Sequence, residues 1–393
     1  MAAVVLLVSM LTFGTIVYWN LLGNVSTFEL EDNSDPELDT FEGGVNILIV
    51  GSDTRVGQGE EFGEGTAEAE GTLNDVNMLF HLSEDHSHAS LVSIPRDTIV
   101  DTPQCTNDEG QQVSEGYGVM MNSILEDGGM GCIVSTVEEM SGLDIQFAAM
   151  ITFRGVIEMS NAVGGVDVCV EQPIEDSYVG LSLDAGTHSL QGEDALKFLR
   201  TRHGVGDGSD LSRITNQQVF LSALFRTVKS NETLTNPTKL YGIARAATQN
   251  MTLSSNMNSV DTLVSLATAL ASVPNEAMGF VRLPVADSTW SPGRVEPTAD
   301  ADVMWQLLQD DQPLIQAADP DAADGGSGAT DDSGTTSPDA TTPGATDDGS
   351  GATDDGTGAT DDGTGSTDAP VTTPTFDGQT ADQQTCSNTD TLF

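Results

Sequence analysis

Basic side chains are scarce in this chain. Its 393 residues include 13 Lys and Arg against 61 Asp and Glu, so the formal net charge is −48 at pH 7. Nucleic-acid affinity depends largely on Lys and Arg that neutralise phosphates, so we expect no binding to DNA or RNA. A basic cluster that would hold the protein on anionic lipid is also missing. The acidic excess suits a protein adapted to high salt, and equally an ordinary acidic secreted protein.

Several catalytic signatures are absent as well. The sequence contains no GxSxG, GxxxxGK, GxGxxG or HExxH motif. These absences argue against a serine hydrolase of the elbow type, a P-loop NTPase, a dinucleotide enzyme and a zinc protease. The histidines show no metal-ligand spacing, and we expect His81, His86 and His88 to lie on the surface.

The N-terminal segment is the one long apolar run. Residues 2–22 carry no charge and are long enough to cross about 30 Å of hydrocarbon. A cleaved signal peptide is the alternative, but no clean A-x-A site follows. We predict a transmembrane anchor over residues 1–23, with the bulk of the chain extracytoplasmic, and a polar stalk over residues 24–44.

The body of the chain alternates two kinds of segment. Strand-like runs at 45–53, 76–83, 90–97 and 166–170 alternate with helix-like runs at 132–142, 155–165, 192–199 and 210–229. Amphipathic stretches at 238–248 and 258–272 continue the pattern. The alternation predicts an α/β (α+β) domain over residues 45–318, with a central mixed, partly antiparallel sheet flanked by helices.

The C-terminal segment has a different composition. The sequence GATDD begins at Gly328, Gly344, Gly351 and Gly358, and few large apolar residues follow residue 319. Such a segment cannot offset the entropy of ordering, so residues 319–393 are predicted to be a disordered acidic tail that carries a terminal cysteine.

The four cysteines suit an exported protein with two disulfides. A bridge between Cys105 and Cys132 would close a loop of about 28 residues and stabilise the fold by roughly 3–4 kcal/mol. That would leave Cys169 and Cys386, although the spacing alone does not fix this pairing. Zinc-binding CxxC spacing is absent.

Polar residues stand at the ends of three predicted strands. Asp53 ends the first strand and Asp75 begins the second. Arg96 and Asp97 end the third strand. If the three strands are antiparallel, these residues gather at one edge of the sheet. Carboxylates and an arginine there would suit a divalent cation that bridges a phosphate, although such residues are also common in turns.

Two further groups are candidates for a phosphate site. Arg200 and Arg202 can bind one ligand only in extended chain, so the preceding helix would have to end near Phe198. Their guanidinium groups match phosphate oxygens, but they could instead neutralise carboxylates. The other group is Asp210, Arg213 and Gln217, which share a helix face that could line a site or form a surface pair. Ser209 or Asp210 is the expected N-cap of this helix.

Together these segments resemble the LytR–CpsA–Psr family of cell-wall glycopolymer ligases, actinobacterial members in particular. The matching elements are the anchor, NILIVGSDTR, NDVNMLFHL, LVSIPRDT, MNSILEDGG, TVEEMSGLDI, AVGGVDVCV, LDAGTHSLQGEDALKFLRTRH and GDGSDLSRITNQQVFLSALF, in that order. The resemblance covers roughly residues 45–310.

The resemblance implies an extracytoplasmic phosphotransferase with pyrophosphatase side activity. Its donor would be a polyprenyl-pyrophosphate-linked glycan, its acceptor peptidoglycan, and its cofactor Mg²⁺ or Mn²⁺. The apolar face between sheet and helices would receive the lipid chain. Mg²⁺ and arginines suffice for such chemistry because they neutralise and align the phosphates.

The family's motifs assign roles to particular residues. Asp53 and Asp75 would hold the metal ion, and Arg96, Arg200 and Arg202 would clamp the pyrophosphate. Asp97 would orient Arg96 or act as a base. The implied substrate-binding residues are Arg55, Asn122, Arg213 and Gln217. The closing GQTADQQTC resembles the Cys-containing end of actinobacterial members and so implies a Cys169–Cys386 bridge.

Three positions depart from the family pattern. Leu73, Met121 and Asn216 stand where basic residues are usual. Each lost charge-assisted contact would weaken pyrophosphate binding by about 1.5–3 kcal/mol. The alternative hypothesis is therefore a degenerate member that binds polyprenyl phosphate or wall polymer as an anchor or scaffold, without turnover.

Overall fold

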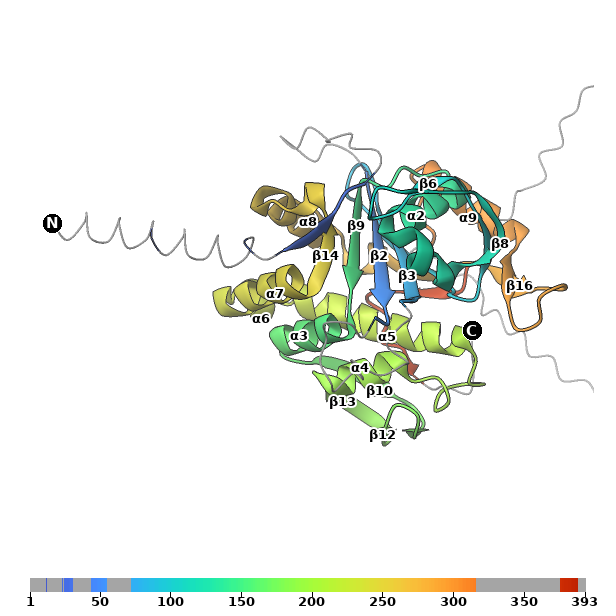
Figure 1. Ribbon diagram of the computed structural model, residues 1–393. Coiled ribbons are helices and arrows are strands. Elements are labelled where there is room, and N and C mark those ends of the chain that lie inside the picture. Colours follow the sequence, from blue (N-terminus) through green and yellow to red (C-terminus); the bar gives the residue numbers. More distant parts are fainter. Residues whose placement is uncertain are drawn as a thin grey trace, which may run out of the picture. The chain divides into compact units, whose positions relative to one another are not determined.

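The computed structural model describes residues 25–30, 44–54, 72–315 and 375–387, together with positions 12 and 23. Within them the predicted α/β class is confirmed, since a mixed sheet of eight strands is flanked by helices (Figure 1). The predicted anchor, apart from positions 12 and 23, lies outside the described residues. So do positions 24 and 31–43 of the predicted stalk, and positions 319–374 and 388–393 of the predicted tail. Among the described residues, none of the helices has the length and apolar character needed to cross a bilayer.

The main sheet is built around an antiparallel meander. Strands β2 (Val45–Ser52), β3 (Asn74–Leu82) and β4 (Ala89–Ile94) pair antiparallel in chain order. On either side β9 (Phe147–Ile151) runs parallel to β2, and β15 (Met278–Arg282) runs parallel to β4. The outer strands are β14 (Met251–Ser254), β1 (Ser26–Phe28) and β18 (Gly378–Thr380).

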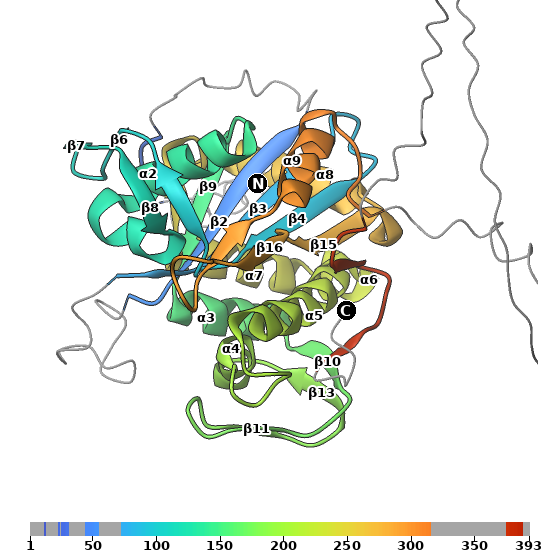
Figure 2. The ribbon, with the colours of Figure 1, turned by 90° about the vertical axis from the view of Figure 1, so that its right-hand side faces the viewer.

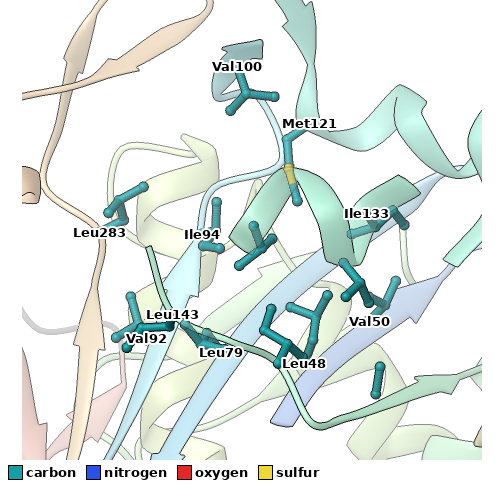
Figure 3. Packing of buried hydrophobic residues seen from close by; sticks show 14 of the residues in the cluster. Leu48, Val50, Leu79, Val92, Ile94, Val100, Met121, Ile133, Leu143 and Leu283 are labelled. Carbon is teal, nitrogen blue, oxygen red and sulfur yellow. The ribbon is translucent and has the colours of Figure 1, made fainter. Parts of the chain in front are cut away.

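Helices cover both faces of this sheet (Figure 2). On one face, α2 (Ile124–Ser141) and α9 (Ala299–Gln309) close a core in which Leu48 and Val50 are fully buried. Figure 3 shows these two side chains beside Ile133 of α2. Because side chains alternate along a strand, Ile47 and Ile49 point to the opposite face, toward α5 (Asp210–Lys229) and α8 (Val260–Ser272).

A smaller sheet packs on the outer side of α5. Its strands are β13 (Gly186–Leu190), β10 (Val166–Val170) and β19 (Cys386–Ser387). Apolar residues of β10, α5 and α4 (Glu193–Arg200) form the core between them. α5 therefore lies between two sheets, and α3 (Phe153–Val163) and α7 (Pro237–Asn250) lie beside it (Figure 1).

The remaining elements are short. Within the described residues, four antiparallel pairs stand apart from the two larger sheets. They join β5 (Ile99–Thr102) to β8 (Gly116–Met120), β6 (Cys105–Thr106) to β7 (Gln112–Val113), β11 (Ile174–Asp176) to β12 (Leu181–Leu183), and β16 (Val285–Asp287) to β17 (Val295–Pro297). Helix α6 (Asn231–Leu234) and the 3-10 turns Met121–Ser123, Ser255–Met257 and Asn275–Ala277 complete the list.

Two predicted boundaries are wrong. Residues 26–28 of the predicted stalk form β1, and Phe28 belongs to the buried core. Residues 375–387 of the predicted disordered tail are ordered, because β18 pairs with β15 and β19 pairs with β10. We call residues 375–387 the C-terminal segment. It is covalently fixed by the Cys169–Cys386 disulfide, while Cys105–Cys132 ties β6 to α2.

The surface position predicted for His81 is also wrong. Its side chain is buried, with Nδ1 2.8 Å from Asn46 Oδ1 and Nε2 3.3 Å from Asp311. Burial lowers the pKa of His81, against the opposing effect of Asp311. His81 is the last residue but one of β3, which lies between β2 and β4 in the sheet, and Asp311, just after α9, lies against its ring.

Candidate active site

The predicted gathering of strand ends is confirmed for Asp75 and Arg96. The antiparallel register places the start of β3 beside the end of β4, and Arg96 NH1 donates to Asp75 Oδ1 over 2.6 Å. Arg96 Nε lies 3.2 Å from Asp210 Oδ1 at the start of α5. Burial lowers the pKa of the Arg96 guanidinium, but the nearby carboxylates of Asp75 and Asp210 have the larger effect and raise it.

Asp53 lies close to this edge but faces a backbone group. Its Oδ1 accepts a hydrogen bond of 2.8 Å from the Leu73 amide, and its own amide donates to the Leu73 carbonyl. This double contact fixes Asp53 beside Leu73, which lies two residues before Asp75 in the chain. The predicted substrate residue Arg55 lies outside the described residues.

Asp97 points away from Arg96 toward the β16–β17 hairpin. Its Oδ1 accepts from Arg294 NH1 over 2.5 Å, whereas its Oδ2 is 3.8 Å from Arg96 Nε. The Val295 amide also donates to the Asp97 carbonyl. Asp97 therefore joins the hairpin to the strand end that carries Arg96.

The helical spacing of Asp210, Arg213 and Gln217 produces one face, as predicted. Ser209 is the N-cap, and its hydroxyl accepts from the Ser212 amide. Arg213 NH2 lies 2.7 Å from Asp210 Oδ1 and donates to the Asp75 carbonyl over 3.0 Å. Burial raises the pKa of Asp210, although Arg213 and Arg96 oppose that shift. Asp210 thus links two arginines, a role that its spacing alone did not reveal.

The arginine pair is presented differently from the prediction. α4 continues to Arg200, two residues beyond Phe198, and the chain leaves helical geometry at Thr201 (φ −59°, ψ 137°). Both arginines nevertheless line the same cavity, because the helix ends between them. The Arg200 guanidinium lies over the Phe153 ring, 4.3 Å from its centre, and Arg202 Nε donates to the Gly208 carbonyl.

Asp176 was not predicted, yet it holds the turn that carries these arginines. Its carboxylate accepts from Thr201 Oγ1 and from the amides of Arg202, His203 and Tyr178, over 2.8–3.1 Å. Burial alone would raise the pKa of Asp176, but these hydrogen bonds lower it to about 2. No motif in the sequence marks this residue, since its partners are mostly backbone groups.

The site opens into a cavity of about 340 Å³ between the main sheet and helices α3, α4 and α5. Its charged lining consists of Asp75, Arg96, Asp176, Arg200, Arg202 and Arg213. Along α5 the lining changes from Arg213 and Gln217 in the first two turns to Phe220, Leu221 and Leu224 further on. The cavity is therefore charged at one end and apolar along the rest of its length.

The three departures from the family pattern, at Leu73, Met121 and Asn216, all lie outside the lining of this cavity. Met121 is fully buried in the core under α2 (Figure 3). Asn216 is also buried, and its Nδ2 donates to the Phe198 carbonyl while its Oδ1 accepts from Ser387. Neither side chain lines the cavity, and the lining itself contains four arginines.

Two predicted substrate residues act on their neighbours. Asn122 is buried outside the cavity lining, and its backbone N–H donates to the Arg96 carbonyl over 3.0 Å. Gln217 does line the cavity, and its Nε2 donates to the Leu199 carbonyl over 3.0 Å. Both contacts hold the backbone next to a cavity arginine.

The residues fit a divalent cation only as a partial ligand set. Among the described residues no group of three or more His, Cys, Asp or Glu side chains could enclose a metal ion. Asp75 lines the cavity, whereas Asp53 lies next to the lining residue Ser52. Mg²⁺ commonly takes one or two carboxylates and completes its shell with phosphate oxygens and water, so this pair is compatible with it.

Comparison with known proteins shows which family has this architecture. The family model described as "LytR_cpsA_psr family" matches residues 23–311. The chain therefore belongs to the LytR–CpsA–Psr family.

Named relatives agree with this assignment. The chain is 30% identical over 308 residues to the cell wall biosynthesis protein LcpA of Corynebacterium glutamicum, covering 72% of this chain and 58% of LcpA. It is 30% identical over 202 residues to the polyisoprenyl-teichoic acid–peptidoglycan teichoic acid transferase TagT of Bacillus subtilis, covering 50% of this chain and 55% of TagT. The chain spans about half of the length of the curated relatives it matches.

A solved structure shows the same fold. The LytR-Csp2A-Psr enzyme from Actinomyces oris has a TM-score of 0.52 and 20% sequence identity. The match covers 72% of this chain and 94% of that one. At this identity the likeness establishes the fold alone.

Proposed function

We propose that this protein is an extracytoplasmic, single-pass membrane phosphotransferase that moves a glycan phosphate from a polyprenyl-pyrophosphate carrier to peptidoglycan. The observation that carries the proposal is the cavity itself, which joins four arginines to a long apolar interior. A polyprenyl pyrophosphate has the same division, with an anionic head and a hydrocarbon tail. The printed name of TagT, a polyisoprenyl-teichoic acid–peptidoglycan transferase, supports the same class of donor and acceptor.

The arginines provide the binding energy for the head group. Arg96 and Arg213 are already held by Asp75 and Asp210, so their guanidinium groups are oriented before a ligand arrives. Arg200 and Arg202 flank the turn fixed by Asp176 and line the cavity from the α4 side. Such fixed charges stabilise the extra negative charge that develops on phosphoryl oxygens during transfer.

Mg²⁺ or Mn²⁺ is the cofactor that we propose, held by Asp75 and Asp53 together with the phosphate oxygens. When bound, the cation would neutralise charge on the pyrophosphate. Arg96 would hold Asp75 in place, since the two side chains already share a hydrogen bond. We assign Asp97 a positioning role rather than that of a base, because Arg294 holds its carboxylate.

The transfer itself is a displacement at one phosphorus atom. A hydroxyl oxygen of the acceptor forms a new P–O bond to the sugar-linked phosphorus, and the P–O bond to the polyprenyl phosphate breaks. The hydroxyl proton passes to water, and polyprenyl phosphate leaves with the bridging oxygen. With water as acceptor, the same displacement is the proposed pyrophosphatase side activity.

We favour the phosphotransferase over the binding-only alternative. It depended on three missing basic residues, but Met121 and Asn216 lie outside the cavity lining. Leu73 also lies outside the lining, and its backbone is hydrogen-bonded to Asp53. The charged end of the cavity retains four arginines despite these changes.

The test is release of phosphate from a soluble prenyl pyrophosphate by the full chain in detergent, with Mg²⁺ present or chelated, at low and molar salt. We expect metal-dependent release that falls by at least about 100-fold in Arg96→Ala, because a charge-assisted contact in the transition state is lost. Arg245→Ala is the matched control, since Arg245 is exposed on α7 and contacts Gln249. No release by folded protein at any salt concentration would instead support the binding-only alternative.

A further inference from the structure

A second, smaller cavity lies on another face of α5. It has a volume of about 170 Å³, and its lining includes Asp207 of the loop before α5, several residues of α5, and Arg282 at the end of β15. Its α5 residues Ser212, Thr215 and Gln218 recur at every third position and so share a face. Arg213 and Gln217 line the larger cavity instead, so the helix separates the two spaces. We call the smaller one the C-terminal pocket, because Asp377 and Gly378 of the C-terminal segment close it.

One lining group has an unmet hydrogen bond. The Gln218 side chain is 6% exposed, and its Nε2 has no hydrogen-bond partner. An unpaired donor in a buried position costs free energy, and a ligand that brings an acceptor removes that cost. Gln218 is one of the lining residues, so the pocket is where a ligand would meet this side chain.

The other polar groups restrict the chemistry of such a ligand. Asp207 accepts hydrogen bonds from Ser209 and Ser212, which lower the pKa of its carboxyl to about 2 and keep it ionised. The Asp377 carboxylate is paired with Arg282, so the lining carries an excess of one negative charge. The excess negative charge repels an anion. A cation is repelled by the partial positive charge of the Gln218 N–H groups. A hydroxyl group suits both partners, because it accepts from Gln218 and donates to a carboxylate.

The pocket is linked to the phosphate end of the larger cavity. The loop before α5 carries Asp207 into the C-terminal pocket, while the next residue, Gly208, accepts a hydrogen bond from Arg202. Arg202 lines the larger cavity. A polymer that passes over this loop can therefore place a phosphate at Arg202 and a neighbouring unit beside Gln218, across one helix diameter of about 10–12 Å.

We propose that the C-terminal pocket binds one uncharged sugar unit of a wall glycan, with Gln218 donating to a sugar oxygen. The polyhydroxylated character of the ligand follows from the pocket, whereas its identity as wall glycan rests on the proposed function. The sugar can come from the peptidoglycan acceptor or from the donor glycan, since both present hydroxyl groups.

Isothermal titration calorimetry of the full chain in detergent tests the proposal with two probes. The first is the N-acetylglucosamine–N-acetylmuramic acid disaccharide, and the second is a soluble prenyl-pyrophosphate-linked N-acetylglucosamine. We expect Gln218→Met to weaken binding of one probe by about fivefold, because it keeps the side-chain length but removes the donor. Weakening of the first probe assigns the pocket to the acceptor, and weakening of the second assigns it to the donor.

Controls keep the result interpretable. Gln249→Met on the exposed part of α7 is the matched control, and Thr215→Tyr, which fills the pocket from a half-buried position, is the second variant should Gln218→Met fail to fold. Unchanged binding of both probes in the folded variants overturns the proposal, as does Mg²⁺ alone competing for the pocket.

Hydrolysis of unglycosylated prenyl pyrophosphate should stay unchanged in Gln218→Met. If the unmodified protein already fails to hydrolyse this compound, the proposed function is refuted, whereas sugar binding in the pocket is still tested by the calorimetry.

Discussion

The two faces of the main sheet are built from alternate residues of the same strands, yet they differ in packing. On the α2 and α9 face, Leu48 and Val50 of β2 are fully buried in a filled core (Figure 3). On the α5 face, Ile49 and Gly51 of the same strand line the 340 Å³ cavity. One face is therefore a filled core, whereas the other combines a second core, which includes the fully buried Phe147, with an apolar space that can hold a ligand.

The largest expected effect comes from filling the hollow face. Met159→Trp replaces a flexible side chain that lines the cavity with a larger indole ring, at a half-buried position on α3. We expect the hydrolysis rate of a long-chain prenyl pyrophosphate to fall at least about tenfold relative to that of a short-chain one, because the tail loses its space while the head-group site is untouched. Rates for both chain lengths give this ratio directly. An equal fall for both chain lengths would count against an apolar space reserved for the tail.

The opposite substitution on the filled face should affect stability instead. Leu48→Ala leaves a hole in a close-packed core and should lower the free energy of unfolding by about 2–5 kcal/mol. The ratio of the two hydrolysis rates should stay at its original value in the protein that remains folded. Urea unfolding together with the same assay checks both parts, and a changed ratio would show that the two faces are not independent.

A smaller and pH-dependent effect is expected at the turn that carries Arg202. The pKa of Asp176 is about 2 in the folded protein, below its usual value near 3.8, so its ionised form stabilises the fold above the unfolded pKa. That stability, about 2 kcal/mol, should be lost as the pH falls from about 4 toward 2. Asp176→Asn should show a flatter decline in unfolding free energy over this range than the unmodified chain. Parallel curves for the two proteins would refute the assignment.

The antiparallel meander and the charged strand ends could be predicted from sequence, since alternating patterns and a short hairpin fix which ends meet. Asp176 could not, because its partners are mainly backbone amides of a turn that only the fold creates. The C-terminal segment was predicted as disordered from its polar composition. Its order depends on backbone pairing with β15 and β10, on the Cys169–Cys386 disulfide, and on Phe376 and Ala381, whose side chains are buried in the cores on the main sheet.

The end of α4 and the departures from the family pattern are two further features whose side-chain directions could not be predicted from sequence. Arg200 was expected to need extended backbone, but a helix that ends between two arginines also brings both to one cavity. Asn216 was counted as a lost charge, although its side chain joins the C-terminal segment to the end of α4. Sequence position gave the residue types, and only packing decided which direction each side chain takes.

The most direct test of the central claim is a crystal structure of the protein with a prenyl pyrophosphate and Mg²⁺. The account predicts the pyrophosphate within hydrogen-bond distance of Arg96, Arg200 and Arg202, and the hydrocarbon tail against Phe220 and Leu224 of α5. A tail bound outside the cavity, or a pyrophosphate that contacts none of these arginines, would contradict it.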